Sequence, residues 1–309
     1  MSALPTQVQN NRTLLLTGAT GFLGSHLLKA LLNASYKVII LKRSTSNTWR
    51  IVNLLNKVTS YDIDRVPLIQ AFEDQHIDAV IHTACQYGHN GDSVHQVVET
   101  NLLFGLKLLD AATLFNTTTF INTDTFFNTN TVLQKYLSSY ILSKKQFVEW
   151  LCQRSENIQI INMKLEHLYG PQDNIAKFIP WVLSQFEQKV EEIDLTRGEQ
   201  LRDFIYVDDV VSAYLITLQK YVELPGYNQF DVGTGILISI RELVENIKAA
   251  YDEKQTSSKI KLNFGALPYR DGEMMRINVD NSKLMALGWQ AGVDLNTGLK
   301  KMIKQKFAK

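Results

Sequence analysis

The chain has few cysteines, almost no net charge and no long apolar segment. Only two of its 309 residues are cysteine, which is too few for a disulfide framework and leaves Cys85 and Cys152 as candidates for small core residues. The net charge of +1 predicts no nucleic-acid or membrane partner. Residues 1–11 are polar, unlike a signal peptide, and no segment has the length of a membrane span. These absences predict a cytoplasmic globular protein with reduced thiols.

The hydrophobic content, 45% of the residues, is sufficient for one large core and a smaller lobe. In the first half of the chain, short apolar runs typical of buried strands alternate with amphipathic helical patterns. Strands are expected at 13–17, 37–41, 79–82, 118–123 and 158–165, and helices at 22–32, 94–115 and 137–154. This alternation predicts an α/β fold of the Rossmann type, a doubly wound parallel sheet with helices on both faces.

The alternation weakens after Gly170, where loops and shorter elements follow. Helices are expected there at 178–186, 208–221, 239–251 and 295–304. We therefore assign residues 1–170, with a return of the chain at about 205–235, to a dinucleotide-binding domain. Residues 171–309 are expected to form mainly a smaller α/β substrate-binding lobe over the carboxyl ends of the strands, where open α/β sheets bind ligands.

A glycine-rich segment, T-G-A-T-G-F-L-G at residues 17–24, lies between the first expected strand and the first helix. Its glycines let the chain turn sharply, let a pyrophosphate approach the backbone amides, and let the helix pack close to the strand. Structural turns also collect glycine, but the strand–turn–helix context favours dinucleotide binding. The residues expected to contact the cofactor are Gly18, Thr20, Gly21, Phe22, Leu23 and Gly24.

The end of the second expected strand predicts which dinucleotide binds. An NAD site usually has a carboxylate there for the ribose 2′-hydroxyl, whereas a basic residue suits a 2′-phosphate. This strand ends in Lys42, Arg43 and Ser44, and no carboxylate occurs between Lys37 and Arg50. The pattern favours NADP(H). The alternative is that Lys42 and Arg43 are an ordinary solvated strand end.

A Tyr-x-x-x-Lys pair, Tyr140 and Lys144, lies on an expected helix. Residues four apart on a helix share one face, so the ammonium group lies beside the phenol. A nearby cation favours the phenolate and lowers a pKa that is otherwise near 10 toward the range useful for acid–base catalysis. An exposed helix often carries both residues by chance, but this one follows a strand that ends near Thr123, whose hydroxyl is suited to hold a substrate oxygen beside the phenol.

Together these motifs resemble the extended short-chain dehydrogenase/reductases that act on nucleotide sugars. The matching segments run from about residue 12 to 305 and include T-G-A-T-G-F-L-G, His82-Thr83-Ala84, Asn101 with Gly105, Y-I-L-S-K at 140–144, L-Y-G-P at 168–171, R-D-F-I-Y-V-D-D at 202–209 and L-G-W at 287–289. The resemblance implies that Thr123, Tyr140 and Lys144 are catalytic and that Asn101 supports a water near Lys144. It also implies cofactor contacts from Asp62, Ile63, Thr83, Ala84, Tyr140 and Lys144.

A closer resemblance is to members of that family that use NADPH to reduce the 4-keto group of a CDP-linked 4-keto-3,6-dideoxyhexose in O-antigen assembly. It rests on N-T-D-T-F-F at 122–127, M-K-L-E-H-L-Y-G-P at 163–171 and G-E-Q-L-R-D-F at 198–204. It implies a CDP- or dTDP-linked 4-keto sugar as substrate, and the family resemblance implies a homodimer. The residues expected to contact the substrate are His89, Asp124, Thr125, Glu166, His167, Lys177, Phe178, Arg202 and Arg270.

Several of these residues have structural alternatives. Arg202 suits a diphosphate because a guanidinium matches paired phosphate oxygens, but with Asp203 beside it an ion pair is also open. Glu166 would equally pair with a basic neighbour, and Asp124 would equally fix the turn after the catalytic threonine. No second ligand at a metal spacing accompanies His82, so no metal site is expected.

The chain departs from two other activities of the resembled family. The 4,6-dehydratases follow the catalytic threonine with an Asp-Glu pair, whereas Asp124 and Thr125 follow Thr123 here, so the base for elimination is missing. A 4-epimerase would be expected to retain NAD, which the basic strand end disfavours. The alternatives that stay open are a nucleotide-sugar 4-epimerase, a dTDP-4-ketosugar reductase and a catalytically silent NADP-binding protein.

Overall fold

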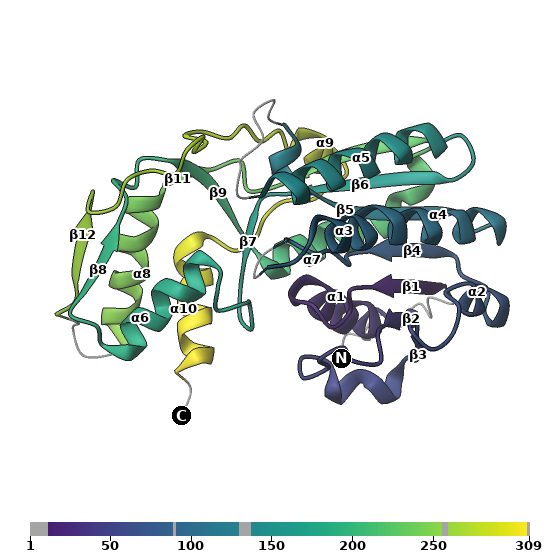
Figure 1. The fold of residues 1–309 in the computed structure, drawn as a ribbon, viewed down its shortest axis with the longest axis horizontal. Helices are drawn as coiled ribbons and strands as arrows, with labels where there is room; N and C mark the ends of the chain where they lie inside the picture. Colours follow the sequence, from purple (N-terminus) through teal and green to yellow (C-terminus); the bar gives the residue numbers. More distant parts are fainter. Residues whose placement is uncertain (1–11, 89–90, 130–136, 255–258, 308–309) are drawn as a thin grey trace, which may run out of the picture. The chain divides into compact units, whose positions relative to one another are not determined.

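The computed structural model describes residues 12–88, 91–129, 137–254 and 259–307. Its strands are β1 Thr13–Thr17, β2 Lys37–Lys42, β3 Thr59–Asp62, β4 Ala79–His82, β5 Thr119–Thr125, β6 Gln159–Leu165, β7 His167–Tyr169, β8 Glu192–Leu195, β9 Leu201–Tyr206, β10 Tyr227–Val232, β11 Leu237–Ser239 and β12 Lys261–Phe264. Its α-helices are α1 Phe22–Asn33, α2 Gln70–Asp74, α3 Val94–Val98, α4 Phe104–Leu114, α5 Ser138–Arg154, α6 Phe178–Gln188, α7 Val207–Lys220, α8 Ile240–Lys254, α9 Ser282–Ala286 and α10 Leu295–Lys306. Figure 1 shows these elements in sequence colours.

Seven strands form one sheet in the order β10-β6-β5-β4-β1-β2-β3. The pairs from β3 to β5 are parallel, and Thr17 of β1 lies opposite Leu41 of β2 and His82 of β4. The carboxyl ends of these strands therefore meet at one edge of the sheet, which is where open α/β sheets bind ligands. The predicted doubly wound Rossmann fold is confirmed.

The chain divides into two compact units. Unit 1 comprises residues 1–123, 143–162 and 221–228, and unit 2 comprises 124–142, 163–220 and 229–309. Strands β5, β6 and β10 and helix α5 run across this division. The assignment of residues 1–170 and 171–309 to cofactor-binding and substrate-binding domains stays a prediction.

The core of unit 1 follows from the apolar strands that the sequence predicted. Leu15, Val80 and Phe120 on β1, β4 and β5 are fully buried, and Phe147 and Leu151 of α5 pack into the same cluster. Burying side chains of this size stabilises the fold by about 1.5–3 kcal/mol each, before the entropy of ordering them is subtracted. Helices α4 and α5 approach closely at Gly105, where an added Cβ would come within 2.7 Å of the ring of Phe147.

The helix predicted over residues 94–115 is interrupted. Ser93 caps its start by accepting from the backbone of Gln96, but the α-helical pattern gives way to a π-helical turn at Glu99–Leu103 before α4 begins. A π-turn inserts one residue into the helical repeat and is common near functional sites. Hydrophobic periodicity does not show such an insertion, because the apolar residues on either side still alternate at helical spacing.

Unit 2 contains two further sheets that the sequence did not predict, with strand orders β11-β9-β7 and β12-β8. Its amphipathic helices, in contrast, lie within a few residues of the predicted ranges. Helix α10 is fixed closely at Gly298, where an added Cβ would come within 2.1 Å of the Tyr169 hydroxyl oxygen. Four of the five strands, β7, β8, β11 and β12, were missed because three or four residues carry too little alternation to stand out.

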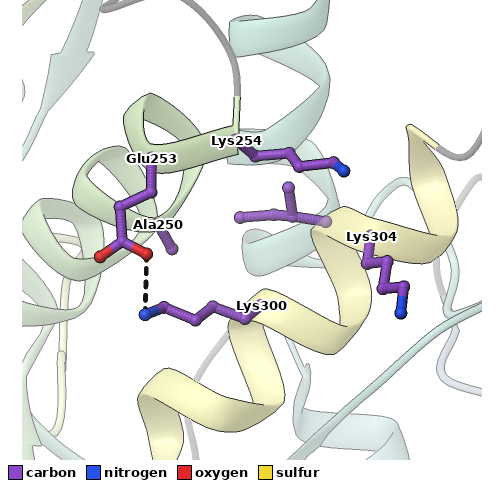
Figure 2. Close-up of a pocket in the computed structure, with 6 residues that line it drawn as sticks. Ala250, Glu253, Lys254, Lys300 and Lys304 are labelled. Carbon is purple, nitrogen blue, oxygen red and sulfur yellow. Dashed lines mark ion pairs between the residues drawn. The ribbon is translucent and has the colours of Figure 1, made fainter.

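A small cavity of about 210 Å³ opens between α8 and α10 of unit 2. Figure 2 shows Lys300 pairing with Glu253 across it at 2.7 Å, with Lys254 and Lys304 at its rim. Ala250 and Ile303 complete the lining. None of these residues is among those that the sequence predicts for the cofactor or the substrate.

Several surface expectations can be compared with the structure. Cys85 and Cys152 are both exposed free thiols, so the expectation that they are small core residues is wrong.

Among the described helices, none is long and apolar enough to cross a membrane. Leu151 of α5 is buried in the core of its own unit, whereas Leu103 and Trp150 are exposed. The homodimer stays a prediction.

Candidate cofactor and substrate site

The glycine-rich turn joins β1 to the amino end of α1. Gly18 has a φ of +71°, in the left-handed region that favours glycine, and its carbonyl accepts from the Gly21 backbone at 2.9 Å. A Cβ on Gly24 would come within 2.1 Å of that same carbonyl oxygen. The turn is therefore held by close contacts between backbone atoms. The N-cap residue of the 12-residue helix α1 makes no side-chain cap hydrogen bond, which suits a site for an anion.

Two other predicted cofactor residues lie against this turn. The Thr83 hydroxyl donates to the Thr17 carbonyl at 2.8 Å, and the Ala84 amide donates to the Thr17 hydroxyl at 3.3 Å. A Cβ on Gly18 would collide with both residues, at 2.6 and 2.7 Å. The structure therefore brings the end of β4 and the glycine turn together, as the sequence predicted from two separate motifs.

The basic end of β2 has carboxylate partners that the sequence analysis missed. Lys42 Nζ forms an ion pair with Asp62, which lies opposite it on β3. The backbone amide and hydroxyl of Ser44 donate to Asp64 at 2.7 and 2.5 Å, and these hydrogen bonds lower the pKa of Asp64. Asp62 ends the neighbouring strand β3 and Asp64 follows that strand, each twenty residues after its partner, so neither occurs in the sequence around the end of β2.

An arginine near this strand end was also missed. Arg50 Nη1 donates to the Thr20 carbonyl of the glycine turn at 3.3 Å, and its guanidinium lies 4.4 Å from the Trp49 ring centroid. This contact places a cation beside the predicted pyrophosphate turn. Arg43, in contrast, is exposed at the end of β2. The signal for Arg50 was present in the sequence, but it lies outside the strand-end position that the motif specifies.

A buried histidine, His82, contacts the residue that precedes the glycine turn. His82 Nδ1 shares a hydrogen bond of 2.8 Å with the Thr17 hydroxyl. Burial, with the charge of Lys144, lowers the pKa of His82 to about 3, so the ring stays neutral at physiological pH. The rings of Phe104 and Phe147 enclose it at 5.7 and 5.6 Å between centroids. His82 is a structural residue of the strand end.

Lys144 and Asn101, two of the predicted catalytic residues, are held by hydrogen bonds within unit 1. Lys144, which is 3% exposed, donates from Nζ to the Thr123 carbonyl oxygen. Asn101, in the π-turn, donates to the Ser143 hydroxyl at 3.0 Å and exchanges two hydrogen bonds with the Gln86 backbone. The π-turn thus ties the start of α5 to the loop after β4. The roles predicted for these residues in catalysis stay predictions.

Tyr140 lies one helical turn before Lys144 on α5. It belongs to unit 2, where its ring packs in a small apolar cluster with Leu137, Ile141 and Phe127, and the residue is 5% exposed. Residues four apart on one helix share a face, so the phenol and the ammonium group keep the spacing that the sequence predicted.

Arg202, a predicted substrate residue of unit 2, and its neighbour Asp203 are both buried charged residues. Arg202 pairs with Glu273 at 2.6 Å, whereas Asp203 accepts from the Thr234 and Gly235 backbone amides at 3.0 and 2.7 Å. Arg202 and Asp203, considered above as an ion pair, therefore each have other partners in the structure. Burial raises the pKa of Asp203 despite these hydrogen bonds.

Glu166 follows the last residue of β6, and His167 is the first residue of β7. The lysine nearest Glu166 in sequence, Lys164, pairs with Asp231 at 2.6 Å, and neither oxygen of Glu166 has a hydrogen-bond partner among the described residues. Its contact with a basic neighbour is that of Oε2 with Nδ1 of His167, at 3.9 Å. His167 lies among aromatic rings, with Phe126 at 4.3 Å between centroids.

The remaining predicted substrate residues are placed as follows. Asp124 and Thr125 are buried at the end of β5. Lys177 caps the start of α6 and pairs with Asp173 at 3.1 Å, and Phe178 begins that helix. Arg270 is exposed, and His89 lies outside the described residues. Within the described ranges, no group of three or more histidine, cysteine or acidic side chains has an arrangement suited to a metal ion.

Known proteins match this fold and these motifs along nearly the whole chain. The NAD dependent epimerase/dehydratase family matches residues 14–233. The chain belongs to this family. CDP-abequose synthase of Salmonella muenchen is 37% identical over 96% of this chain and 98% of its own length, and its counterpart in Salmonella typhimurium is 33% identical over 94% and 97%. The predicted family membership is confirmed, and with it a nucleotide-sugar enzyme of the epimerase/oxidoreductase type.

Solved structures confirm the fold of this family member. UDP-glucose 4-epimerase from Thermotoga maritima, solved with UDP-glucose, has a TM-score of 0.81 at 23% identity and covers 96% of this chain and all of its own. The Thermus thermophilus UDP-glucose 4-epimerase, solved with NAD, has a TM-score of 0.76, also at 23% identity, and covers 96% of this chain. At these identities the likeness concerns the arrangement of the elements.

Proposed function

We propose that this protein uses NADPH to reduce the 4-keto group of a CDP-linked 4-keto-3,6-dideoxy sugar, giving a product of the CDP-abequose type. The observation that carries the proposal is the 37% identity to a CDP-abequose synthase over nearly the full length of both chains. It is supported by Thr123, Tyr140 and Lys144, which provide the hydroxyl, the phenol and the amine that such a reduction needs. Asp124 followed by Thr125 leaves no acid–base pair for a dehydratase.

The glycine turn fits a dinucleotide. Any side chain at Gly18 or Gly24 would fill the space that the backbone of the turn and the end of β4 leave, at 2.1–2.6 Å from neighbouring atoms. The first amides of α1 would hold a pyrophosphate, because helix amino termini carry partial positive charge. When bound, the nicotinamide supplies the hydride.

The chain's own catalytic residues manage the proton. Tyr140 donates it to the reduced oxygen, and the Thr123 hydroxyl holds that oxygen by a hydrogen bond. Lys144 keeps the phenol acidic through its positive charge, and its contact with the Thr123 carbonyl fixes the ammonium group at the end of β5. Asn101 steadies this region through Ser143, the residue that precedes the lysine.

NADPH is preferred to NADH in this proposal because cations outnumber acids around the end of β2. Asp62 and Asp64 balance Lys42 and hold Ser44, but Arg43 and Arg50 add two further positive charges. A guanidinium suits a phosphate dianion because it offers paired donors. The exposed Arg43 is the residue best placed by sequence to contact a 2′-phosphate.

Replacing Arg43 with aspartate is expected to weaken NADPH binding about 10- to 100-fold and to change NADH binding by less than about threefold, since hydrogen bonds to charged groups contribute about 1.5–3 kcal/mol. Fluorescence titration with both dinucleotides measures the two Kd values. Arg154→Asp, at the exposed carboxyl end of α5, is the matched control and should leave both unchanged. Equal weakening of NADPH and NADH by Arg43→Asp would remove the argument for NADP specificity.

The decisive test of the function is direct turnover. The protein is incubated with NADPH and, in separate reactions, CDP-4-keto-3,6-dideoxyglucose and dTDP-4-keto-6-deoxyglucose, and NADPH consumption is followed by absorbance. Consumption with the CDP sugar, with the configuration at C4 assigned by NMR, supports the proposal. Conversion of a nucleotide sugar without net NADPH use would indicate an epimerase. No conversion of either sugar would favour a silent dinucleotide-binding protein.

A further inference from the structure

The carboxyl group of Glu166 is sealed inside unit 2 at the junction of β6 and β7. Its side chain has no exposed surface, and neither of its oxygens has a hydrogen-bond partner in the part of the chain that the structure describes. On one side it packs against Gly233, where an added Cβ would come within 2.8 Å of its Cγ. Burial, with the charges of Asp203 and Asp231, raises the pKa of Glu166 to about 9. At neutral pH the group therefore carries a proton.

The side chain of His167 offers a nitrogen near that proton. Its Nδ1 lies 3.9 Å from Oε2 of Glu166, too far for a hydrogen bond, and among the described residues this nitrogen too is buried without a partner. Rings of Phe126 and Phe204 hold the imidazole at 4.3 and 5.4 Å between centroids. The side chain is 26% exposed and Nδ1 contributes nothing to that surface, so we assign contact with a ligand to the other ring nitrogen, Nε2.

The surroundings of His167 are positively charged. Burial, then Arg202 and Lys177, lower the pKa of the imidazole, which keeps the ring neutral. An anion at the exposed edge of the ring would oppose the field of these two cations and so favour the imidazolium form. The other charged groups packed around the pair are Lys164, Asp203, Asp231 and Glu273.

We propose that Glu166 and His167 share one proton, which a phosphate of the bound nucleotide sugar draws from the carboxyl group onto the imidazole. When the two side chains close from 3.9 Å to hydrogen-bonding distance, the O–H bond of Glu166 breaks, an N–H bond forms at Nδ1 of His167, and Nε2–H donates to a phosphate oxygen. The neutral pair becomes an ion pair, so the protein takes up no proton from solvent. The inference rests on the proposed function for the identity of the ligand, and it makes His167 a binding residue and Glu166 its positioning residue.

The predicted signature is a binding reaction whose proton balance depends on Glu166. Calorimetric titrations with CDP and with inorganic pyrophosphate are made in buffers of different ionisation enthalpy, between about pH 6 and 8. Glu166→Gln has the size of the protonated acid but cannot release a proton, so it should fold normally. In this variant, imidazolium must form by uptake from solvent. Relative to wild type, we expect up to one extra proton taken up and an affinity that falls by as much as tenfold per pH unit.

Nitrogen-15 NMR of His167 gives an independent readout. At about pH 8, pyrophosphate should shift both ring nitrogens of the wild-type residue to imidazolium values, and it should leave the Glu166→Gln ring neutral. The protonation of the ligand itself is the same for both proteins and cancels in the comparison. Glu245→Gln, a substitution of an exposed side chain on α8, is the matched control and should behave as wild type.

The outcomes separate this inference from the proposed function. Equal proton uptake by wild type and Glu166→Gln, or a wild-type ring that stays neutral with ligand bound, would overturn the shared proton. Failure of both CDP and pyrophosphate to bind would overturn the anion-binding role of His167. Normal binding with the predicted proton balance, but no reduction of any ketosugar, would support the shared proton and reject the proposed reaction alone.

Discussion

Replacing Tyr140 with phenylalanine should lower turnover by about two to four orders of magnitude while changing NADPH affinity by less than about threefold. The reason is that the substitution removes only the hydroxyl group that donates the proton. The ring keeps its packing against Leu137, Ile141 and Phe127, so the fold should be unaffected. Steady-state assays with the ketosugar give kcat, and fluorescence titration gives the NADPH Kd.

The matched control for this prediction is Tyr251→Phe. That tyrosine lies on α8, donates to the Phe186 carbonyl at 3.2 Å, and is not one of the predicted site residues. Its loss should cost about 1 kcal/mol of stability and leave kcat near the wild-type value. A Tyr140→Phe enzyme that turns over within a few fold of wild type would show that another group donates the proton.

Replacing Gly24 with alanine is expected to weaken dinucleotide binding by about 100-fold or more, because the new methyl group would stand 2.1 Å from the Gly18 carbonyl oxygen. Backbone must move to relieve this contact, and forced packing of this kind also costs about 1–3 kcal/mol of stability. Titration with NADPH measures the affinity, and thermal unfolding followed by circular dichroism shows how much of the fold remains.

Gly292→Ala is the control for that substitution. A Cβ there would meet its nearest neighbour, an oxygen of Asp209, at 3.6 Å, which is an ordinary contact. We expect wild-type affinity and nearly wild-type stability from it. If Gly24→Ala binds NADPH within about threefold of wild type, the close approach of α1 to β1 is not what shapes the cofactor site.

The fold of the first half was predictable from sequence because its signals are local. A buried parallel strand is a continuous apolar run such as Leu14–Leu16, and an amphipathic helix repeats over several turns, so each element identifies itself. The three-residue strands β7 and β11 carry no such repeat. Their pairing with β9 depends on contacts between distant segments, which periodicity does not show.

The site was predictable only where a motif fixes the spacing. The glycine turn and the Tyr140–Lys144 pair have a set separation along the chain, and so they were found. The ion pair of Lys42 with Asp62 depends on the register between β2 and β3, which becomes known only when the strands are placed. Likewise, the unpartnered state of Glu166 is a property of three-dimensional burial, and sequence gives only its identity.

The pairing of Lys42 with Asp62 has a consequence for enzyme engineering. Converting a reductase from NADPH to NADH commonly means introducing an acid at the end of the second strand to receive the ribose hydroxyls. Here the acid is already supplied by the adjacent strand and is occupied by a lysine. Deleting that lysine, together with the charge of Arg43, would release Asp62 for a ribose. For the NADPH-dependent reductase proposed above, we therefore expect removal of the positive charges at positions 42 and 43 to favour NADH without the introduction of a new acid.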